Sequence, residues 1–387
     1  MIKKGVETII LFILLLSMNA CCNDDDSVKT FSGKTVLVYM VADNSLSSDA
    51  QVNIDSLVSG FGRNDINGNL LIYLDRRNEV PKLIQLLKSD DGTVSRQAVR
   101  TYEEQNSVSP TVMASVLKEV TARFPSTSYG LVLWSHGYGW LPGTTSSKAV
   151  TTRWFGQDGT DEMDLADLAT ALSEGPHFDY ILFDACFMGG VETAYALRGC
   201  TDYLIASPTE VLSDGFPYSE MVPYMMGSTK SDYIRMASLY YEHYSAMTGY
   251  SCSAAVGCIK CSELEALALE TKMLISAHAA DLDSFDVSSV QCFESYSPHL
   301  FYDFGDFVEN FTTELQRHYF KLQLEKAVVY KACTENILSV NGSSHYFSVE
   351  HFSGLSTYIP SSVTATRNAS YQTLEWYTAV GWSKTKW

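Results

Sequence analysis

The stretch from Asp179 to Gly190 constrains the fold of this 387-residue chain more strongly than any other segment. Tyr180 to Phe183 form a short, continuous apolar run typical of a buried parallel strand, and residues 191–197 have the pattern of a helix. Cys186 therefore lies between the tip of a strand and the start of a helix. The positive end of a helix dipole and nearby backbone N–H groups favour a thiolate there, and the thiolate is the reactive form of cysteine.

Two further features decide how Cys186 is interpreted. A cysteine at the end of a buried strand is often only a small packing residue. However, residues 129–134 form a second buried-strand run, and His136 follows it closely. Ligands bind at the carboxyl ends of parallel strands, where a thiol and an imidazole together can attack a carbonyl group. Residues two apart in a strand share a face, so Asp184 is expected to point into the same cleft as Cys186.

Two tripeptides carry a resemblance to a known family, namely Ser135-His-Gly137 and Asp184-Ala-Cys186. Each closes an apolar strand, and the histidine precedes the cysteine by about fifty residues. In these features the chain resembles the caspase-like clan of cysteine peptidases, and within that clan the clostripain family. The resemblance extends from about residue 34 to the C-terminus, with further matching segments at 35–44, 213–218 and 354–360.

The resemblance implies a caspase-like α/β/α sandwich with a mostly parallel central sheet and a smaller C-terminal helical subdomain at about 225–350. It also implies a catalytic dyad, in which Cys186 attacks the scissile carbonyl and His136 protonates the leaving amine. Water then cleaves the thioester. The backbone N–H groups of Gly137 and Cys186 are the expected oxyanion donors, because strand-to-helix turns commonly supply such donors. No third member of a triad is evident from the sequence.

Hydrophobic patterns along the chain predict the same class of fold. Strands are predicted at 35–42, 69–75, 82–87, 97–101, 202–207, 252–259 and 354–359, and helices at 53–61, 110–124, 162–172, 230–247 and 264–282. Strands that alternate with helices indicate a parallel sheet covered on both faces.

Acidic residues near the cysteine suggest a preference for basic substrates. In the clostripain family, acids at the positions matching Asp184 and Asp214 are associated with cleavage after Arg or Lys. A carboxylate in a partly dry pocket forms strong charge-assisted bonds with such side chains, and Arg is favoured because it can bind through two parallel bonds. Glu210 lies in the same loop as Asp214 and is a further acid for the cleft. Aspartate is also common at turns for purely local reasons.

The segment 139–154 is rich in turn formers and small hydroxyl residues, which predicts an exposed loop. Exposed loop tips are preferred sites of proteolysis. Lys148 and Arg153 are its only basic residues. The resemblance implies a zymogen that cuts itself in the 141–156 loop, after Arg153 or, as second choice, Lys148, which would yield chains 34–153 and 154–387. An ordinary surface loop is the alternative.

The first residues have the form of an export signal, with Lys3 and Lys4 before a short apolar run. The run ends at Cys21, as in bacterial lipoprotein signals, so we expect a signal peptide at 1–20, lipidation of Cys21 and a tether at 21–33. Use of Cys22 or simple secretion stays open. The expected location is a bacterial membrane, at the outer membrane, periplasm or cell surface, with the lipid anchor as the only membrane contact.

Composition limits the range of partners. The net charge of −18 argues against nucleic acid and is compatible with cationic peptide substrates. Beyond Cys22 the chain has seven cysteines, and an odd number leaves at least one thiol unpaired, for which Cys186 is the candidate. The Cys258–Cys261 spacing lacks a second pair and is interpreted as structural. No metal-ligand spacing is present, so no cofactor is expected to be required, although calcium, which often helps clostripain-like enzymes, is left open.

The leading hypothesis is thus an exported, monomeric Arg/Lys-specific cysteine endopeptidase that becomes two-chain after self-cleavage. Two alternatives stay open. A catalytically silent surface binding or scaffold lipoprotein could keep the fold without turnover. A thiol-dependent transferase or ligase of peptide bonds would use the same Cys186 and His136.

Overall fold

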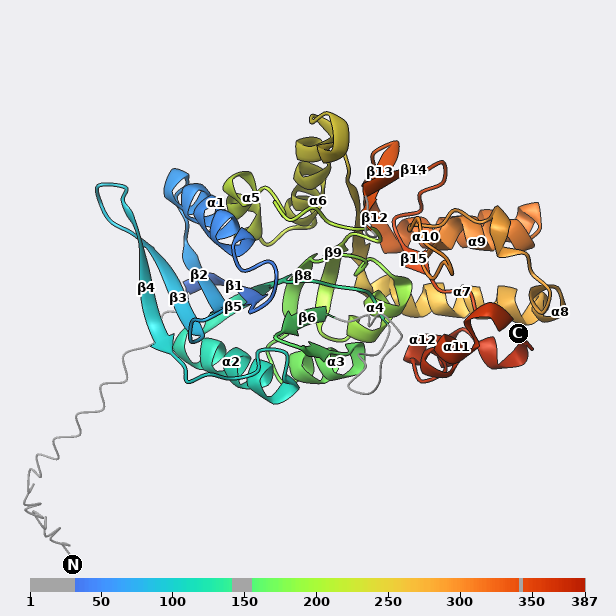
Figure 1. Cartoon of the computed structure of the whole chain (residues 1–387), viewed down its shortest axis with the longest axis horizontal. Helices are drawn as coiled ribbons and strands as arrows, with labels where there is room; N and C mark the ends of the chain where they lie inside the picture. The colour runs from blue at the N-terminus through green and yellow to red at the C-terminus, as the bar shows by residue number, and fades with distance from the viewer. Residues whose placement is uncertain (1–31, 141–154, 341–343, 387) are drawn as a thin grey trace, which may run out of the picture. The chain divides into compact units, whose positions relative to one another are not determined.

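A nine-stranded sheet forms the centre of the computed structural model, which describes residues 32–140, 155–340 and 344–386 (Figure 1). Its strands are β1 (Ser32–Ala42), β2 (Gly68–Arg76), β3 (Lys82–Lys88), β4 (Val94–Thr101), β5 (Ser126–Trp134), β8 (Phe178–Asp184), β9 (Thr201–Ala206), β10 (Ala255–Lys260) and β12 (Val328–Cys333). Their order is β12-β10-β9-β8-β5-β1-β2-β3-β4. The central strands from β9 to β2 are parallel, and antiparallel pairs flank them at both edges. The predicted mostly parallel sheet is confirmed.

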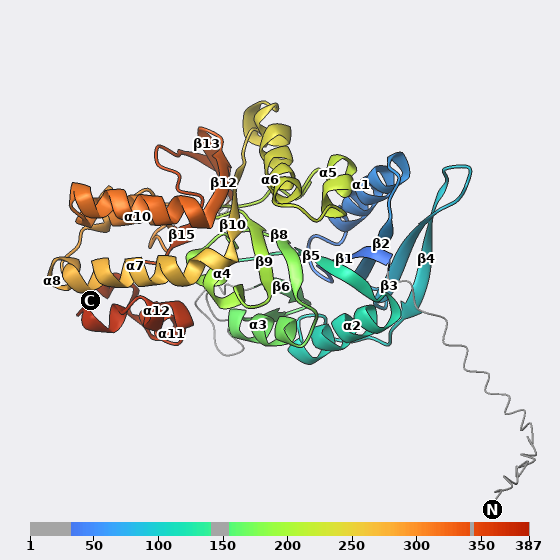
Figure 2. The same cartoon turned by 180° about the vertical axis from the view of Figure 1, so that it is seen from behind.

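Helices cover both faces of the sheet because successive residues of each central strand point to opposite sides. In β1, Val36, Val38 and Met40 belong to one apolar core, whereas Leu37 and Tyr39 belong to the other. The first core is closed by α1 (Asp49–Arg63), α5 (Tyr218–Met225) and α6 (Lys230–Ser245), and the second by α2 (Pro110–Arg123), α3 (Leu165–Ser173) and α4 (Val191–Leu197). Figures 1 and 2 show these two sets of helices on opposite sides of the strands.

The C-terminal third adds helices beyond the β12 edge of the sheet (Figures 1 and 2). They are α7 (Leu264–Ala277), α8 (Ala279–Leu282), α9 (Phe304–Phe311), α10 (Glu314–Ala327), α11 (Ala365–Tyr371) and α12 (Glu375–Ala379). Two small antiparallel pairs accompany them, β11 (Tyr302–Asp303) with β15 (Ser356–Thr357) and β13 (Asn336–Val340) with β14 (Ser344–Ser348). A third pair, β6 (Phe155–Asp158) with β7 (Asp161–Met163), precedes α3 and lies beside Gly137. The region predicted as a helical subdomain also supplies β10 and β12 to the main sheet.

Several predicted boundaries are wrong, each for a local reason. The helix predicted from residue 162 begins at Leu165, because Asp164 caps it by accepting a hydrogen bond from the Asp167 N–H at 2.9 Å and residues 161–163 pair with β6. The helix predicted over 264–282 is interrupted at His278, between α7 and α8. Of the strand predicted at 354–359, only the two residues of β15 are paired.

The predicted exposed loop at 139–154 is wrong at its start. Trp140 is buried, with its ring packed 4.9 Å from the ring centroids of both Tyr358 and Tyr371. The two predicted cleavage residues, Lys148 and Arg153, lie outside the described residues, as do Cys21, the predicted signal and most of the predicted tether. Ser32 and Gly33, predicted as the end of the tether, already belong to β1.

All seven cysteines of the described chain are free thiols: Cys186, Cys200, Cys252, Cys258, Cys261, Cys292 and Cys333. The unpaired Cys186 expected from the sequence is therefore present in this structure. In the same described ranges, no helix combines the length and apolar character needed to cross a membrane.

Candidate active site

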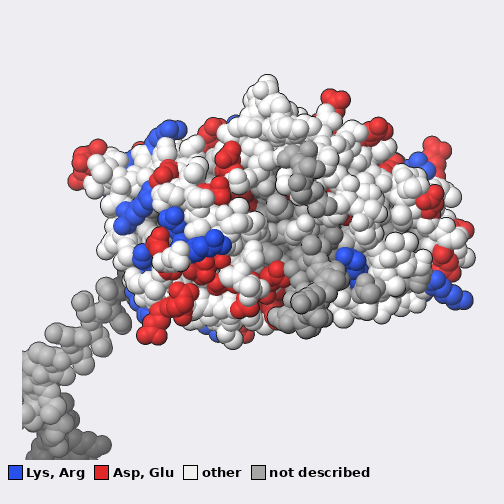
Figure 3. Space-filling view, viewed as in Figure 1, with Lys and Arg blue, Asp and Glu red and all other residues white. Residues whose placement is uncertain are grey.

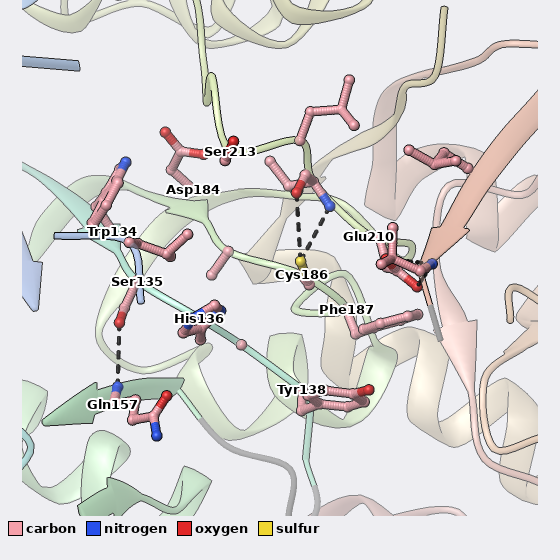
Figure 4. A pocket seen from close by; sticks show the side chains of 17 residues that line it. Trp134, Ser135, His136, Tyr138, Gln157, Asp184, Cys186, Phe187, Glu210 and Ser213 are labelled. Atoms are coloured by element: carbon pink, nitrogen blue, oxygen red, sulfur yellow. Dashed lines mark hydrogen bonds between the residues drawn. The ribbon is translucent and has the colours of Figure 1, made fainter. Parts of the chain in front are cut away.

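The register between β5 and β8 brings the predicted histidine and cysteine to the same level. Trp134 and Asp184 are paired at the carboxyl ends of these neighbouring parallel strands. His136 and Cys186 each follow two residues later, in the histidine loop (residues 135–140) and the cysteine loop (residues 185–190). Both side chains line one cavity, as the sequence predicted (Figure 4).

Gly137 allows the two loops to pack against each other. A Cβ atom at this position would lie 2.7 Å from the Cys186 carbonyl oxygen and 2.9 Å from the Ala185 Cβ, so a larger residue would push the loops apart. The backbones of Gly137 and Cys186, the two predicted oxyanion donors, are therefore in close contact. This contact explains why the histidine is followed by glycine.

The cavity has a volume of about 560 Å³ and is lined from four directions. The histidine and cysteine loops form one side, residues 210–213 form another, and Leu46 and the β13 residues Leu338 and Val340 complete it. Apart from its ionisable groups, the lining is largely aliphatic and aromatic. A peptide side chain with an apolar stem and a charged end would fit such a lining.

The Cys186 side chain is half-buried and is held by the chain that follows β9. Its Sγ accepts a hydrogen bond from the Val211 N–H at 3.2 Å and lies 3.6 Å from the Val211 carbonyl oxygen (Figure 4). Burial raises the pKa of Cys186 to about 12, and the negative charges of Glu210 and Asp184 add to this effect. The raised pKa is opposite to the expected stabilisation of a thiolate, because α4 begins only at Val191, beyond the reach of Cys186.

His136 is bonded by a residue that the sequence analysis missed. Its Nε2 lies 2.8 Å from the Ser45 hydroxyl, in the turn after β1. Burial lowers the pKa of His136, which favours the neutral imidazole, while the nearby charge of Asp49 opposes this shift. The only sequence signal for Ser45 was its place among turn formers after a parallel strand.

Asp184 lies at the base of the cavity and is 4% exposed. Its Oδ2 accepts hydrogen bonds from the Tyr218 hydroxyl at 2.7 Å and the Phe216 N–H at 3.1 Å. Burial raises its pKa to about 6, against the opposing effect of these two bonds, so the carboxylate is mostly ionised at neutral pH. Gly215, with φ of 69°, lets the loop pass this close, because a Cβ there would lie 2.6 Å from Asp184 Oδ2.

The other two acids of the loop after β9 differ in position. Glu210 lines the cavity beside Cys186, and its carboxylate accepts hydrogen bonds from the Val340 N–H at 2.9 Å and the Ser339 hydroxyl at 3.1 Å. Burial raises its pKa. Asp214 is exposed and lies outside the lining, although the preceding Ser213 belongs to it. The structure thus brings Asp184 and Glu210 to Cys186 but leaves Asp214 at the surface.

Further acidic groups lie near the histidine loop. The charges of Asp43, Glu104 and Asp158 all raise the pKa of the buried Asp75, which places these four carboxyl groups close together. Figure 3 shows Asp and Glu side chains gathered in the lower left part of one face. Across residues 32–140, 155–340 and 344–386, no three His, Cys, Asp or Glu side chains are grouped so as to hold a metal ion.

The geometry suits acyl transfer. A half-buried thiol, a neutral imidazole and adjacent backbone N–H groups can together add sulfur to a carbonyl carbon and stabilise the oxyanion. The ionised acid at the base of the cavity would bind a cationic group.

Comparison with known proteins gives a consistent result. A model of the clostripain family of C11 peptidases matches residues 38–387. The structure of an inactive zymogen of a C11 protease from Parabacteroides distasonis is 39% identical, with 91% of this chain and 99% of that chain covered and a TM-score of 0.80. A secreted C11 cysteine protease from Bacteroides thetaiotaomicron, in complex with an irreversible peptide inhibitor, is 34% identical, with coverage of 91% and 100% and a TM-score of 0.82.

A B. fragilis cysteine protease is also similar, at 36% identity over 60% of this chain and 99% of that chain, with a TM-score of 0.56. The search of curated proteins found no match.

Proposed function

The chain belongs to the clostripain family of cysteine peptidases, and on that premise we propose that it is an exported endopeptidase that cleaves after Arg or Lys. Cys186 is the nucleophile and His136 the general acid and base. The observation that carries this proposal is the cavity itself, in which a thiol and an imidazole on adjacent strand ends share one space with the buried carboxylate of Asp184.

The protonation states in the uncut chain suggest the order of proton transfers. Because Cys186 is a thiol and His136 a neutral imidazole, the proton moves from sulfur to the ring as sulfur attacks the scissile carbonyl carbon. The N–H groups of Gly137 and Cys186 stabilise the resulting oxyanion. The imidazolium then protonates the leaving amine, and water, activated by the neutral ring, hydrolyses the thioester.

Asp184 is the proposed specificity residue. A cationic side chain at P1, the residue before the scissile bond, would reach the base of the cavity and pair with this carboxylate. Asp214 is proposed as a second, weaker contact from the surface, because an exposed carboxylate is well screened by water. An entering positive charge would also offset the negative charges of Glu210 and Asp184 at the sulfur and lower the pKa of Cys186.

We further propose that the uncut chain is a zymogen, activated by self-cleavage after Arg153 or Lys148. The raised pKa of the Cys186 thiol supports this proposal, because a protonated thiol is a poor nucleophile. The similar Parabacteroides protein is itself described as an inactive zymogen. Cleavage after Arg153 would leave β6, which pairs with Gly137 in the histidine loop, next to the new chain end.

Export is supported by the similar Bacteroides protein, which is described as secreted. We propose the signal peptide at 1–20, the lipid anchor at Cys21, the tether at 21–33 and a monomeric peptidase domain at 34–387. The proposed substrates are proteins or peptides with basic P1 residues.

The test is to express residues 23–387 as wild type, as Cys186→Ala and, as a matched control, as Cys200→Ala, a half-buried thiol outside the cavity. Intact mass and hydrolysis of small Arg, Lys and Asp substrates are measured with and without calcium. The wild type and the control should split after Arg153 or Lys148 and hydrolyse the basic substrates, whereas Cys186→Ala should do neither.

Other outcomes point to the other functions. If folded wild type stays whole and inert in all conditions, the peptidase proposal fails and a binding protein is indicated. If added amines yield joined rather than hydrolysed products, the enzyme is a transferase.

A further inference from the structure

Ser45 contacts the proposed catalytic histidine from the turn after β1, a strand that carries neither member of the dyad. Its Oγ lies 2.8 Å from His136 Nε2, and it follows β1, the neighbour of β5 in the sheet. We infer that Ser45 is a positioning residue that keeps the Nε2 proton on His136 and thereby directs Nδ1 to the proton transfer with Cys186. This inference rests on the proposed peptidase function.

The turn that carries Ser45 is fixed in place by a buried amide. The Asn44 side chain is 2% exposed, and its Nδ2 lies within hydrogen-bond distance of the Val41 carbonyl at 3.0 Å, the Gln157 carbonyl at 2.7 Å and the Ser135 hydroxyl at 3.3 Å. Its Oδ1 accepts from the Leu46 N–H at 2.8 Å. The residues on both sides of Ser45, Asn44 and Leu46, are therefore held in place by hydrogen bonds.

The Asn44 side chain also connects the turn of Ser45 to the histidine loop, through its contact with Ser135. Ser135, the residue before His136, donates its hydroxyl to the Val41 carbonyl at 2.7 Å and accepts the Gln157 N–H at 3.2 Å. Asn44 and Ser135 thus share bonding partners on β1 and β6. The relative position of Ser45 and His136 is set by this shared network and not only by the bond between them.

The tautomer of His136 decides whether it can act as a base. With the proton on Nε2, the ring donates to the serine oxygen and its Nδ1 lone pair can accept the thiol proton. With the proton on Nδ1, the ring would accept from the serine hydroxyl at Nε2, and Nδ1 would have no lone pair with which to accept the thiol proton. In the inferred arrangement the Ser45 hydroxyl accepts from Nε2–H, which favours the productive form.

The interaction should strengthen as the reaction proceeds. The resting ring is neutral and becomes an imidazolium when it takes the proton from Cys186. A hydrogen bond from a charged donor is stronger than one from a neutral donor, so Ser45 stabilises the charged ring more than the resting ring. An interaction gained mainly in the transition state raises kcat and leaves KM nearly unchanged.

The kinetic test compares Ser45→Ala, Ser45→Thr and Ser48→Ala in the 23–387 protein. Ser48 belongs to the same turn, and its side chain makes no capping hydrogen bond to α1, so it is the matched control. Ser45→Ala should lower kcat on an Arg substrate by about 10-fold, with KM within about twofold. Ser45→Thr keeps a hydroxyl and should recover most of the loss, whereas Ser48→Ala should equal wild type. Thermal melting checks that all variants are folded.

A spectroscopic test does not depend on turnover. In the uncut Lys148→Ala/Arg153→Ala protein with ¹⁵N-labelled histidine, the two ring nitrogens report which one carries the proton, and His136→Asn identifies the His136 signals. The expected result is an Nε2–H ring that becomes a tautomer mixture in Ser45→Ala.

An Nδ1–H ring in the parent protein would overturn the inference, as would unchanged kcat in a folded, active Ser45→Ala variant. If wild type is inert, the proposed function fails, while the tautomer still decides the role of Ser45.

Discussion

The histidine loop and the cysteine loop leave adjacent strands at the same level, but they lie in different electrostatic surroundings. The bonds around the histidine loop come from hydroxyl and amide groups of Ser45, Asn44, Ser135 and Gln157. None of these groups changes charge near neutral pH.

The surroundings of the cysteine loop are dominated by buried carboxyl groups. Asp184 precedes the loop, Glu192 follows it in α4, and Glu210 lies across the cavity, and burial raises the pKa of all three. The difference teaches that the two halves of the site have separate tasks. The groups bonded directly to the histidine loop do not titrate, although Asp75 and Asp158, whose pKa values burial also raises, lie near that loop. The carboxyl groups around the cysteine loop act on the nucleophile itself and make it sensitive to pH and to any cation that enters.

The largest expected effect is on the reactivity of Cys186 in protein kept uncut by Lys148→Ala/Arg153→Ala. With a pKa of about 12 in place of 9.0, the thiolate population at pH 8 is about 1000-fold smaller. The higher nucleophilicity of a more basic thiolate recovers only part of this loss. Alkylation by iodoacetamide, located by peptide mass, should be at least about 100-fold slower than that of N-acetylcysteine. If Cys186 and N-acetylcysteine were alkylated at comparable rates, the cysteine loop would not suppress the thiolate, and the proposed contrast with the histidine loop would be lost.

A second prediction concerns the pH dependence of stability at Glu192. This side chain is 2% exposed, and burial raises its pKa from 4.5 to about 7 although Thr357 and Tyr358 donate to it. The folded state therefore holds a proton that the unfolded state loses, and stability is lost as pH rises from 4.5 to 7.

Glu192→Gln removes this titration. As the pH rises from 4 to 8, the unfolding free energy of Glu192→Gln should increase by about 3 kcal/mol relative to that of wild type. Urea unfolding at both pH values measures the difference, with the exposed Glu325→Gln as control. A constant difference between the two proteins would show that the carboxyl group is not held protonated.

A third prediction ranks the two proposed specificity acids. Asp184→Asn should lower kcat/KM for Arg and Lys substrates by about 10- to 100-fold, because a charge-assisted bond in a buried site is lost. Asp214→Asn should cost less than about fivefold, because its carboxylate is exposed. Melting temperatures verify folding. An equal or reversed ranking would mean that the surface acid carries the specificity.

The smallest expected effect tests the neutral network. Ser135→Ala removes a hydroxyl that bonds the Val41 carbonyl, the Gln157 N–H and the Asn44 amide. The unfolding free energy should fall by about 1–2 kcal/mol, and by the same amount at pH 4 and pH 8. A loss that grows with pH would mean that a charged group takes part in the network.

The sequence predicted those features that depend on neighbouring residues in the chain. His136 and Cys186 were found because each follows a short apolar run, and parallel strands of that kind must end at a common edge of the sheet. Register then follows from pairing, as between Trp134 and Asp184. The fold class and the two side chains in the cavity required no more than this.

Features that depend on distant contacts were missed. Trp140 is buried by Tyr358 and Tyr371, more than two hundred residues away, so its turn-rich surroundings were misleading. The protonated state of Cys186 depends on burial and on the charge of Glu210, which follows another strand. Ser45 and His136 are 91 residues apart, and nothing in a row of turn formers distinguishes the serine that contacts the histidine.

The pairing of β5 with β8 has a consequence for a chain cut between them. Residues 32–140 supply β1 to β5, and residues 155–386 supply β8, β9, β10 and β12 of the same sheet. Either fragment made alone would expose the unpaired edge of a largely apolar strand, which invites aggregation. The fragments should therefore fold only by complementation, and after cleavage they would persist as an obligate pair whose subunit interface is the hydrophobic core of the original protein.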